Sequence, residues 1–588
     1  MGTFYVTTPI YYVNDEPHIG HGYTTILADV LSRYHRLFGD EVFFSTGTDE
    51  HGQKVKEAAQ KRGVDPRKHC DQMVERFADL WKKLHISYSR FIRTTEKRHR
   101  FVVQNLLTYL YERGDIYFDT YTGKYCVSDE RFFTEKDLVG GRCPMCGKDV
   151  ITIEEKNYFF KLSKYRDWLA DYIRNHPGYV RPETRRNEIL GFLKGELSDL
   201  CISRPKTRLD WGIEIPFDKN YVTYVWFDAL VNYISNIGVY RDNESFQKWW
   251  PATVHLVGKD IVTTHAVYWP IMLKSAGFEQ PQTIFAHGWW LIQEEKMSKS
   301  RGNVVRPIDL VDRYGPAAFR WVLMRNMTLG QDAGFSEEGF VGTMNADLAN
   351  DYGNCLNRLA NMVHSYFRGQ VPEPEAYDRE LADRGGELPA QVREAVDAME
   401  LNRALDLVMD YVRGINKYID EKAPWSLHKE QKTGELKTVL YSACEAFRLA
   451  SVLLAPVLVD KAQEALSVFG EDVMPAIRKT NQDQGMLAFG RLQPGKKIKK
   501  RGPLFPRVDS PVPQDERPAG GAQGGAPGAG ASGAGGAKDA GSRKKDSRKE
   551  RDMAEERIDI DFFQKVELRV GTVAEAGKVK GSKKLLRL

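Results

Sequence analysis

The sequence predicts an α/β protein whose parallel sheet is interrupted by an insertion. Near the N-terminus a β-branched and aromatic run, residues 3–8, precedes a helical pattern over 22–39 and a second strand-like run over 41–47. A strand, helix, strand order favours parallel strands joined by a crossover helix. The same texture returns within residues 221–325, and from about residue 345 apolar side chains recur at helical spacing. We therefore expect a split α/β sheet followed by a helical region.

Composition limits the class of protein. At 588 residues the chain is expected to hold several domains, because single cores stop growing near about 250 to 300 residues. A net charge of +5 is too mild to indicate a nucleic-acid partner by itself. The longest apolar run, residues 449–459, falls short of the roughly 18 residues that span a bilayer and predicts a buried helix. No charged, apolar leader precedes the first strand, so we expect a cytoplasmic protein without a membrane partner. Seven scattered cysteines do not suggest a disulfide framework.

Changes of pattern along the chain divide it into domains. Residues 116–220 break the α/β texture, which indicates an inserted domain. After "PLFPRVD" the chain becomes rich in glycine and alanine, which is typical of a flexible linker. The expected segments are the two halves of the α/β domain at 1–115 and 221–325, the insertion at 116–220, a contact region at 326–365, a helical domain at 366–509, the linker at 510–553 and a tail at 554–588.

Two histidines flank a glycine where the first strand gives way to the helix, in "HIGH", residues 18–21. The N-terminus of a helix that follows a parallel strand offers N–H groups to anions. Gly20 lets a flat ring approach the backbone, and His18 and His21 can donate hydrogen bonds to phosphate oxygens from one helical turn. The pattern indicates either a nucleotide site or two histidines that cap a helix.

A second motif, "EEKMSKSRGNVV" at 294–305, places Lys296 and Lys299 beside two serines in a glycine-ended loop. Ammonium groups on such a loop can meet a triphosphate and stabilise charge as pyrophosphate leaves. For this segment alone, an ordinary solvated charge run is the alternative. The two motifs together, in this order at opposite ends of one interrupted domain, are far more specific than either part.

With both motifs in place, the sequence resembles the class I aminoacyl-tRNA synthetases, whose signatures are "HIGH" and "KMSKS", and among them the bacterial methionyl-tRNA synthetases. "TTPIYYVNDEPHIGH", "TGTDEHG", "YVWFDALVNY", "GKDI", "HGWW" and "KMSKSRGNV" look like that family's successive blocks over about residues 3–509. The resemblance implies a Rossmann-type catalytic domain. It also implies a two-step reaction, in which methionine attacks the α-phosphate of Mg-ATP to give methionyl-adenylate and pyrophosphate. The terminal ribose of tRNA(Met), including initiator tRNA, then takes the methionyl group.

The resemblance assigns roles by position. The residues expected to bind ATP are His18, Gly20, His21, Lys296, Ser298 and Lys299, and the four histidines and lysines among them are expected to be catalytic. Lys299 is the better candidate for stabilising the transition state. The family's methionine pocket falls on Ile10, Tyr12, Asp49, Trp226, Ala229, Leu230, Tyr233, Ile261 and His265, with the Asp49 carboxylate for the ammonium group. An aromatic wall suits a thioether, although each aromatic taken singly is more typical of plain core.

The insertion carries cysteines at metal-ligand spacing. Cys143 and Cys146 form a half-site whose proline and glycine allow the tight turn that brings two thiolates to one zinc. Cys126 is a third candidate. The fourth position that matches the family is Asp129, where many relatives have cysteine, and a carboxylate should bind zinc more weakly than a fourth thiolate. We expect one Zn²⁺ per chain, and the alternative is a vestigial knuckle of reduced cysteines without metal.

The helical region and the tail match family segments that bind tRNA. Asn354, Arg358 and Trp425 fall where the family reads the CAU anticodon, and arginine and tryptophan suit hydrogen bonding and stacking to unpaired bases. Solvated surface is the alternative for each residue alone. The tail resembles the start of an oligonucleotide-binding (OB) fold that many bacterial relatives append for dimerisation. Only its opening strands are present, whereas such a barrel needs about five.

Two other classes of protein share parts of this pattern. A small nucleotidylyltransferase also carries an HxGH signature but does not need the helical region or the lysine loop. A non-catalytic tRNA-binding protein fits the tail but does not need Asp49. A synthetase with another amino-acid specificity is the nearest alternative. Pyrophosphate exchange into ATP, run with each amino acid in turn, separates all of these from a methionine enzyme.

We predict that the chain is monomeric and that removal of residues 510–588 leaves methionine activation unchanged. The tail supplies too little apolar surface to offset its ordering entropy, and the linker cannot orient it. Light scattering of the two forms and their pyrophosphate-exchange rates check this. A stable dimer that is lost on truncation would contradict it.

Overall fold

The computed structural model describes residues 2–126, 131–133, 138–144, 146–292, 295–296, 305–499, 502–509, 577–578 and 586–587. The chain divides into two units, Met1–Glu516 and Arg517–Leu588. In the second unit the described residues form one antiparallel pair, β18 (Gly577–Lys578) with β19 (Leu586–Arg587). Most of the predicted OB-type tail, like the linker, lies outside the described residues.

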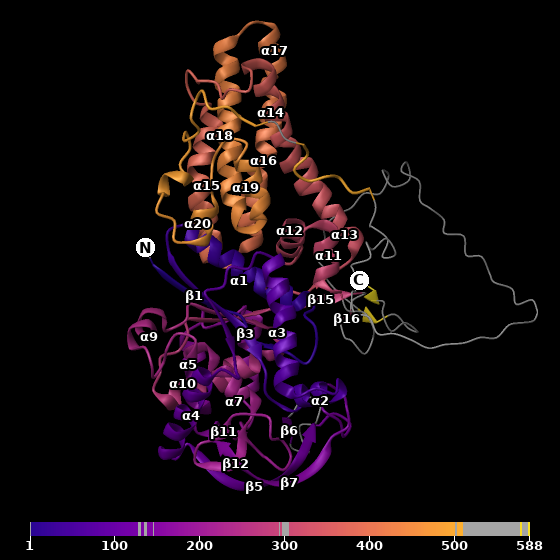
Figure 1. Cartoon of the computed structure of the whole chain (residues 1–588), viewed down its shortest axis with the longest axis vertical. Coiled ribbons are helices and arrows are strands. Elements are labelled where there is room, and N and C mark those ends of the chain that lie inside the picture. Colours follow the sequence, from indigo (N-terminus) through magenta and orange to yellow (C-terminus); the bar gives the residue numbers. More distant parts are fainter. Residues whose placement is uncertain are drawn as a thin grey trace, which may run out of the picture. The chain divides into compact units, whose positions relative to one another are not determined.

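The first unit is built on a seven-stranded sheet in which every pairing is parallel (Figure 1). The strand order is β2-β3-β1-β13-β14-β8, and β4 also pairs with β3. The strands are β1 (Thr3–Thr7), β2 (Tyr11–Tyr12), β3 (Glu41–Asp49), β4 (Arg90–Arg93), β8 (Val180–Arg181), β13 (Val254–Gly258) and β14 (Thr283–His287). The predicted parallel α/β sheet is thus confirmed, and β8 adds to it two residues from within the segment 116–220.

Helices cover both faces of this sheet. They include α1 (Ile19–Leu37), α2 (Gln53–Lys61), α3 (Pro66–Lys83), α4 (Lys97–Glu112) and α10 (Trp269–Ala276). Successive side chains of a strand point to opposite faces. In β1, Phe4 and Val6 pack in the core that contains α1 and α3, whereas Tyr5 packs in the core that contains α4 and α10. The result is a three-layer α/β domain, and in Figure 1 α1 lies above β1 and β3 while α4 and α10 lie below them.

The segment between the two halves of the sheet forms two small antiparallel sheets. One has the order β6-β5-β7-β9 and the other the order β10-β12-β11. Their strands are β5 (Ile116–Cys126), β6 (Arg131–Phe133), β7 (Ile151–Phe160), β9 (Leu200–Cys201), β10 (Ser203–Pro205), β11 (Glu214–Ile215) and β12 (Asp218–Thr223), with helices α5 (Arg166–Asn175) and α6 (Glu183–Phe192). Strands within this segment pair antiparallel, whereas those of the main sheet pair parallel. This difference corresponds to the change of sequence pattern at residues 116–220.

Between the small antiparallel sheets and the helix bundle, short helices and strands precede and follow β13 and β14 of the main sheet. The elements are α7 (Val225–Leu230), α8 (Asn232–Ser235), α9 (Asn243–Trp249), β15 (Trp290–Ile292), β16 (Glu295–Lys296), α11 (Pro307–Tyr314), α12 (Pro316–Asn326), β17 (Ala333–Gly334) and α13 (Glu337–Thr343). The strands β16, β15 and β17 form a separate small sheet in that order.

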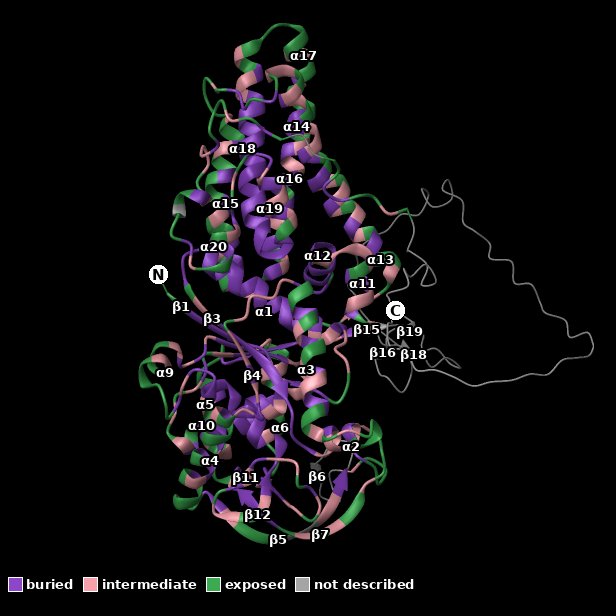
Figure 2. Ribbon diagram, in the orientation of Figure 1, coloured by how far each residue is buried: buried purple, intermediate pink, exposed green. Residues whose placement is uncertain are grey.

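A bundle of helices completes the first unit. Its members are α14 (Asn354–Phe367), α15 (Arg379–Asp397), α16 (Leu401–Lys422), α17 (Pro424–Lys429), α18 (Thr433–Leu458), α19 (Asp460–Leu466) and α20 (Met474–Arg478). Among the described residues α18 is the one helix long and apolar enough to cross a membrane, yet 94% of its most apolar window is buried inside the protein. Figure 2 shows it as the buried axis of the bundle. The predicted buried helix at 449–459 is confirmed, since 449–458 fall within α18 and are buried.

A buried ionic cluster joins α18 to α1. Arg320 of α12 is fully buried and donates to the carbonyls of Pro456 and Val457, at 2.8 Å each, where α18 ends. These carbonyls have no partner within their own helix, so a cation there satisfies them and suits the helix dipole. The same guanidinium lies 2.8 Å from Asp29 of α1. Burial by itself raises the pKa of Asp29, but Arg33 and Arg320 lower it to about 2. The buried Arg320 therefore connects the end of α18 to α1, and Asp29 neutralises its charge.

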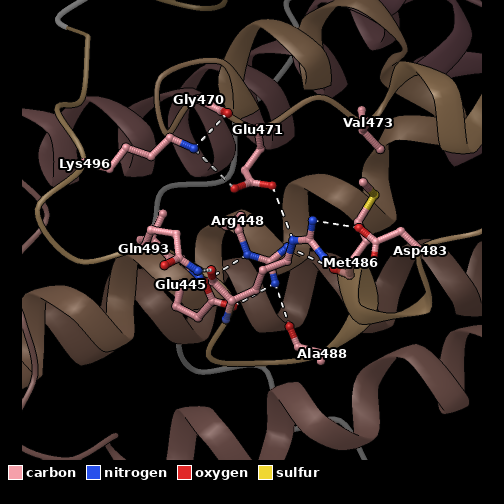
Figure 3. Close-up of polar contacts among 12 residues, drawn as sticks. Glu445, Arg448, Gly470, Glu471, Val473, Asp483, Met486, Ala488, Gln493 and Lys496 are labelled. Atoms are coloured by element: carbon pink, nitrogen blue, oxygen red, sulfur yellow. Dashed lines mark hydrogen bonds and ion pairs between the residues drawn. The ribbon is translucent and has the colours of Figure 1, made fainter.

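A second buried pair holds the end of the bundle segment in place (Figure 3). Glu445 of α18 accepts hydrogen bonds from the backbone N–H groups of Gly490, Arg491 and Leu492 at 2.9, 3.0 and 2.9 Å. Arg448, one turn later, pairs with Glu445 at 2.7 Å and donates to the carbonyls of residues 486 and 488. An internal carboxylate is tolerated because a cation and three N–H groups surround it.

We predict that Glu445→Leu lowers the free energy of unfolding by about 3–5 kcal/mol, because the buried Arg448 guanidinium then lacks its counter-charge. Glu421→Gln, which removes an exposed carboxylate paired with Lys417, is the matched control and should change stability by about 0.5 kcal/mol or less. Urea unfolding followed by tryptophan fluorescence measures both. Equal midpoints for Glu445→Leu and the unsubstituted chain would contradict the assignment.

Candidate active site

The two histidines of "HIGH" cap α1 and stack on each other. The Gly20 N–H donates to His18 Nδ1 at 3.1 Å, and the His18 N–H donates to His21 Nδ1 at 3.2 Å. Their rings stack with centroids 3.8 Å apart. A Cβ on Gly20 would lie 3.0 Å from the His18 ring. The glycine expected to let a flat ring approach the backbone thus makes room for the ring of His18. The capping interpretation is therefore confirmed, and it leaves the first turn of α1 aimed at the carboxyl end of the sheet.

The ends of three strands gather at this turn. β3 ends at Asp49, β13 at Gly258 and β14 at His287. The Thr24 hydroxyl on α1 and His287 Nε2 are 2.7 Å apart, and His287 Nδ1 donates to the Gly288 carbonyl at 2.8 Å. Burial lowers the pKa of His287, so its ring is neutral and joins β14 to α1 through hydrogen bonds. This edge is the crevice where open parallel sheets bind ligands.

Sequence reasoning missed two residues of this crevice, Asp260 and His287. A Cβ on Gly258 would lie 2.6 Å from Asp260 Oδ1 and 3.9 Å from the His287 ring, which shows how closely the ends of β13 and β14 converge. Trp289 donates its indole N–H to Asp260 Oδ1 at 3.2 Å. Both residues lie in "GKDI" and "HGWW", blocks that directly follow strand-like runs. The rule that polar residues after parallel strands face the ligand would have singled them out.

The predicted methionine pocket is built around one hydrogen-bonded pair. The Tyr233 hydroxyl on α8 donates to His265 Nε2 at 2.7 Å, and His265 Nδ1 donates to the Ile261 carbonyl at 2.9 Å. Burial lowers the pKa of His265 to about 4, so the ring is neutral near pH 7. Trp226 meets the His265 ring edge to face, with centroids 6.1 Å apart. These four residues are thus brought together as an apolar wall with neutral polar groups.

The remaining predicted pocket residues lie on the neighbouring elements. Tyr12 of β2 pairs in register with Asp49 of β3, and Asp49 is 3% exposed. Ala229 and Leu230 are buried on α7, while Ile10 is half-buried in the loop between β1 and β2. The two parts of the predicted pocket, one at the end of β3 and one on α7 and α8, come from opposite halves of the interrupted sequence.

The lysine loop is described only at its edges. Lys296 ends β16, which pairs with β15, and the chain resumes before Arg306 at the start of α11. Arg306 forms an ion pair with Glu16 at 3.1 Å, two residues before His18. Ser298 and Lys299 lie outside the described residues. The segment after the loop is therefore tied directly to the "HIGH" loop.

Three cysteines of the insertion form a cluster. The sulfurs of Cys126, Cys143 and Cys146 all lie within 4.8 Å of one another, and the Cys126 and Cys146 sulfurs are 3.5 Å apart. The Gly147 N–H donates to the Cys143 carbonyl at 2.9 Å with a left-handed glycine, which makes the tight knuckle. Asp129 lies outside the described residues. None of the seven cysteines, all of which the structure describes, forms a disulfide.

The predicted anticodon residues lie on the helix bundle. Asn354 begins α14 and is exposed, and Trp425 on α17 is 47% exposed. Arg358, one turn after Asn354, forms an ion pair with Asp420 of α16 and contacts the Asn416 side-chain oxygen at 3.4 Å. The Arg358 guanidinium is therefore held by α16, which the sequence did not indicate.

The family profile "tRNA synthetases class I (M)" matches residues 4–152 and 147–360. A methionine–tRNA ligase of Caldanaerobacter subterraneus is 43% identical over 100% of this chain and 88% of its own length, and one of Thermotoga maritima is 42% identical over the same shares. The chain belongs to the methionine–tRNA ligases. The synthetase joins methionine to tRNA by forming methionyl-adenylate from Mg-ATP and passing the methionyl group to the 3′-terminal ribose.

Solved structures agree with this assignment. Mycobacterium tuberculosis methionyl-tRNA synthetase in complex with methionyl-adenylate matches with a TM-score of 0.81 and 40% identity, over 86% of this chain and 100% of that chain. Because the synthetase belongs to a family of amino-acid-activating enzymes, the alternatives of a nucleotidylyltransferase and a non-catalytic tRNA-binding protein are excluded. A synthetase of another amino-acid specificity is also excluded, because the relatives that match the whole chain are methionine–tRNA ligases.

Proposed function

We propose that the synthetase forms methionyl-adenylate in the crevice at the carboxyl ends of β1, β3, β13 and β14. The observation that carries the proposal is the convergence there of the first turn of α1 with the end of β3. The M. tuberculosis relative, which matches 86% of this chain, was solved with methionyl-adenylate bound. His18, Gly20 and His21 would contact ATP from the first turn of α1, where N–H groups and the helix dipole favour phosphate.

The lysine loop would act on the phosphates. Lys296 and Lys299 would contact the triphosphate together with Ser298, and Lys299 would stabilise the charge that develops as pyrophosphate leaves. The tie between Arg306 and Glu16 supports this, because it keeps the far end of the loop beside the "HIGH" segment. Asp260, at the end of β13, would add a carboxylate that suits the ribose hydroxyls of ATP.

Methionine would lie between Asp49 and the wall of Tyr233, His265 and Trp226. The Asp49 carboxylate would pair with the ammonium group. The wall would hold the thioether through apolar and aromatic contact, because the Tyr233 O–H already donates to His265 and the His265 N–H to the Ile261 carbonyl. Ile10, Tyr12, Ala229, Leu230 and Ile261 would complete the pocket. A neutral wall favours an uncharged side chain because a buried charge would lack a partner there.

The cysteine cluster fits a structural zinc ion. Zinc–sulfur bonds of about 2.3 Å in a tetrahedron place sulfurs about 3.8 Å apart. The sulfur separations here, 3.5 Å for one pair and within 4.8 Å for all, suit three such ligands. Asp129 would supply the fourth. One Zn²⁺ per chain would hold the knuckle of the insertion and take no part in the chemistry.

The helix bundle would read the tRNA. Asn354, Arg358 and Trp425 would contact the CAU anticodon of initiator and elongator tRNA(Met), with the exposed Trp425 ring available for stacking. The segments 1–115 and 221–325 would form the catalytic domain, with 116–220 inserted, 326–365 leading toward the anticodon helices and 366–509 as the anticodon-binding domain. We place the synthetase in the cytoplasm, where its tRNA substrate is used.

We predict that Lys299→Ala lowers the rate of adenylate formation by about two decades or more with little change in methionine affinity, since the lysine acts on the transition state. Single-turnover adenylate formation and methionine titration measure the two quantities. Lys299→Arg, which keeps the charge, is the matched control and should lose less. A raised methionine dissociation constant with an unchanged rate would contradict this role.

We predict that the purified chain carries about one zinc per chain and that Asp129→Cys makes the metal harder to remove with a chelator. Thiolate is a softer ligand than carboxylate and binds zinc more tightly. Metal analysis and the rate of zinc transfer to a chromogenic chelator check both statements. Protein made with ample zinc that contains none would favour the vestigial knuckle.

A further inference from the structure

Asp228 on α7 is a fully buried carboxylate held between two histidines from separate parts of the chain. Its Oδ2 lies 2.6 Å from His51 Nδ1, and its Oδ1 lies 2.7 Å from His99 Nε2. His51 is 5% exposed, and Asp228 and His99 are 0% exposed. A buried carboxylate is costly unless donors compensate it, and each oxygen of Asp228 has one imidazole.

The carboxylate joins the two sides of the proposed methionine pocket. His51 follows Asp49 by two residues, just beyond the end of β3. Asp228 lies in α7 between Trp226 and the buried pair Ala229 and Leu230. The bond between His51 and Asp228 is therefore a direct link between the segment that carries Asp49 and the helix that carries the opposite wall.

The second histidine extends the link to α8. His99 of α4 uses its other ring nitrogen, Nδ1, to contact the Ser235 hydroxyl at 2.8 Å. Ser235 lies two residues after Tyr233 on α8, and its hydroxyl oxygen is also 3.3 Å from the Asn232 carbonyl oxygen. One carboxylate and two imidazoles thus connect β3, α4, α7 and α8, the elements that position Asp49, Trp226 and Tyr233.

The negative charge on Asp228 means that a neutral side chain cannot reproduce its hydrogen bonds to His51 and His99, which together form the joint between these elements. Burial by itself raises the pKa of Asp228, but His51 and the hydrogen bonds from both histidines hold it below its ordinary value, so the group is ionised. An ionised carboxylate only accepts hydrogen bonds, which lets both imidazoles donate. An amide of the same shape has one acceptor and one donor, and its NH₂ group would face a ring nitrogen that donates.

We propose that Asp228, through His51 and His99, is a positioning residue that sets the separation between Asp49 and the Trp226–Tyr233 wall and so determines the affinity for methionine. It touches no substrate. The assignment rests on the proposed methionine pocket. Because the ATP groups lie on α1 and at the ends of β13 and β14, the joint acts on methionine and leaves ATP binding nearly unchanged.

The test is methionine-dependent pyrophosphate exchange by the full chain with His51→Leu, His51→Asn and Asp228→Asn. His51→Leu removes the donor to Asp228 and should raise KM for methionine about ten-fold, with KM for ATP within about two-fold. His51→Asn carries an amide N–H at the height of Nδ1 and should restore KM for methionine to within about three-fold. Asp228→Asn should raise KM for methionine at least as much as His51→Leu.

Asp115→Asn is the matched control. Asp115 is also 0% exposed and accepts from Lys164, Tyr165 and Ser275, none of which belongs to the pocket. It should lower Tm without changing KM for methionine. If His51→Leu and Asp228→Asn behave the same way, or raise both KM values equally, the joint is only structural and the proposal is overturned. Asp49→Asn separates the two assignments, because an unchanged KM for methionine in that variant would refute the pocket itself.

Discussion

The seating of α1 is the constraint on which the rest of the first unit depends. At its start, the reciprocal cap of His18 and His21 and the bond from Thr24 to His287 hold the first turn against the ends of the parallel strands. In its middle, Asp29 binds the buried Arg320, which closes the end of α18. At its far end, the Asn481 N–H donates to the Arg36 carbonyl at 2.9 Å. One helix therefore connects the crevice, the bundle and the returning chain.

Hydrogen bonds between buried polar side chains connect the elements around the crevice to one another. His255 of β13 accepts from the Trp269 indole at 3.3 Å and donates to Thr7 at 2.8 Å, while the Tyr233 ring lies over it with centroids 4.2 Å apart. The Tyr5 hydroxyl donates to the Tyr233 carbonyl at 2.7 Å. Since unpaired buried groups are costly, such complete pairing restricts each side chain to one arrangement. These hydrogen bonds therefore hold the Tyr233 side of the proposed methionine pocket in place.

The sequence predicted correctly those features that depend on residues close together in the chain. The 3.6-residue periodicity after the first strand indicates α1, and the Cys143–Cys146 knuckle follows from its own proline and glycine. "HIGH" supported two interpretations, and the cap that the structure contains is compatible with phosphate binding by the same turn. The pairing of Arg358 with Asp420, in contrast, joins residues 62 positions apart, which no local pattern reports.

By itself the sequence determined the α/β class, the change of pattern within residues 116–220, the buried core helix and, through its two spaced motifs, the class of chemistry. Each depends on short-range periodicity or on residues adjacent in the chain. Only the tertiary structure decided that β8 joins the main sheet, that His287 meets α1, and that Asp228 lies between His51 and His99. These contacts join residues up to 263 positions apart. They form only when sheet order and helix packing bring distant segments together, and buried polar groups then pair with whatever donor the fold places within reach.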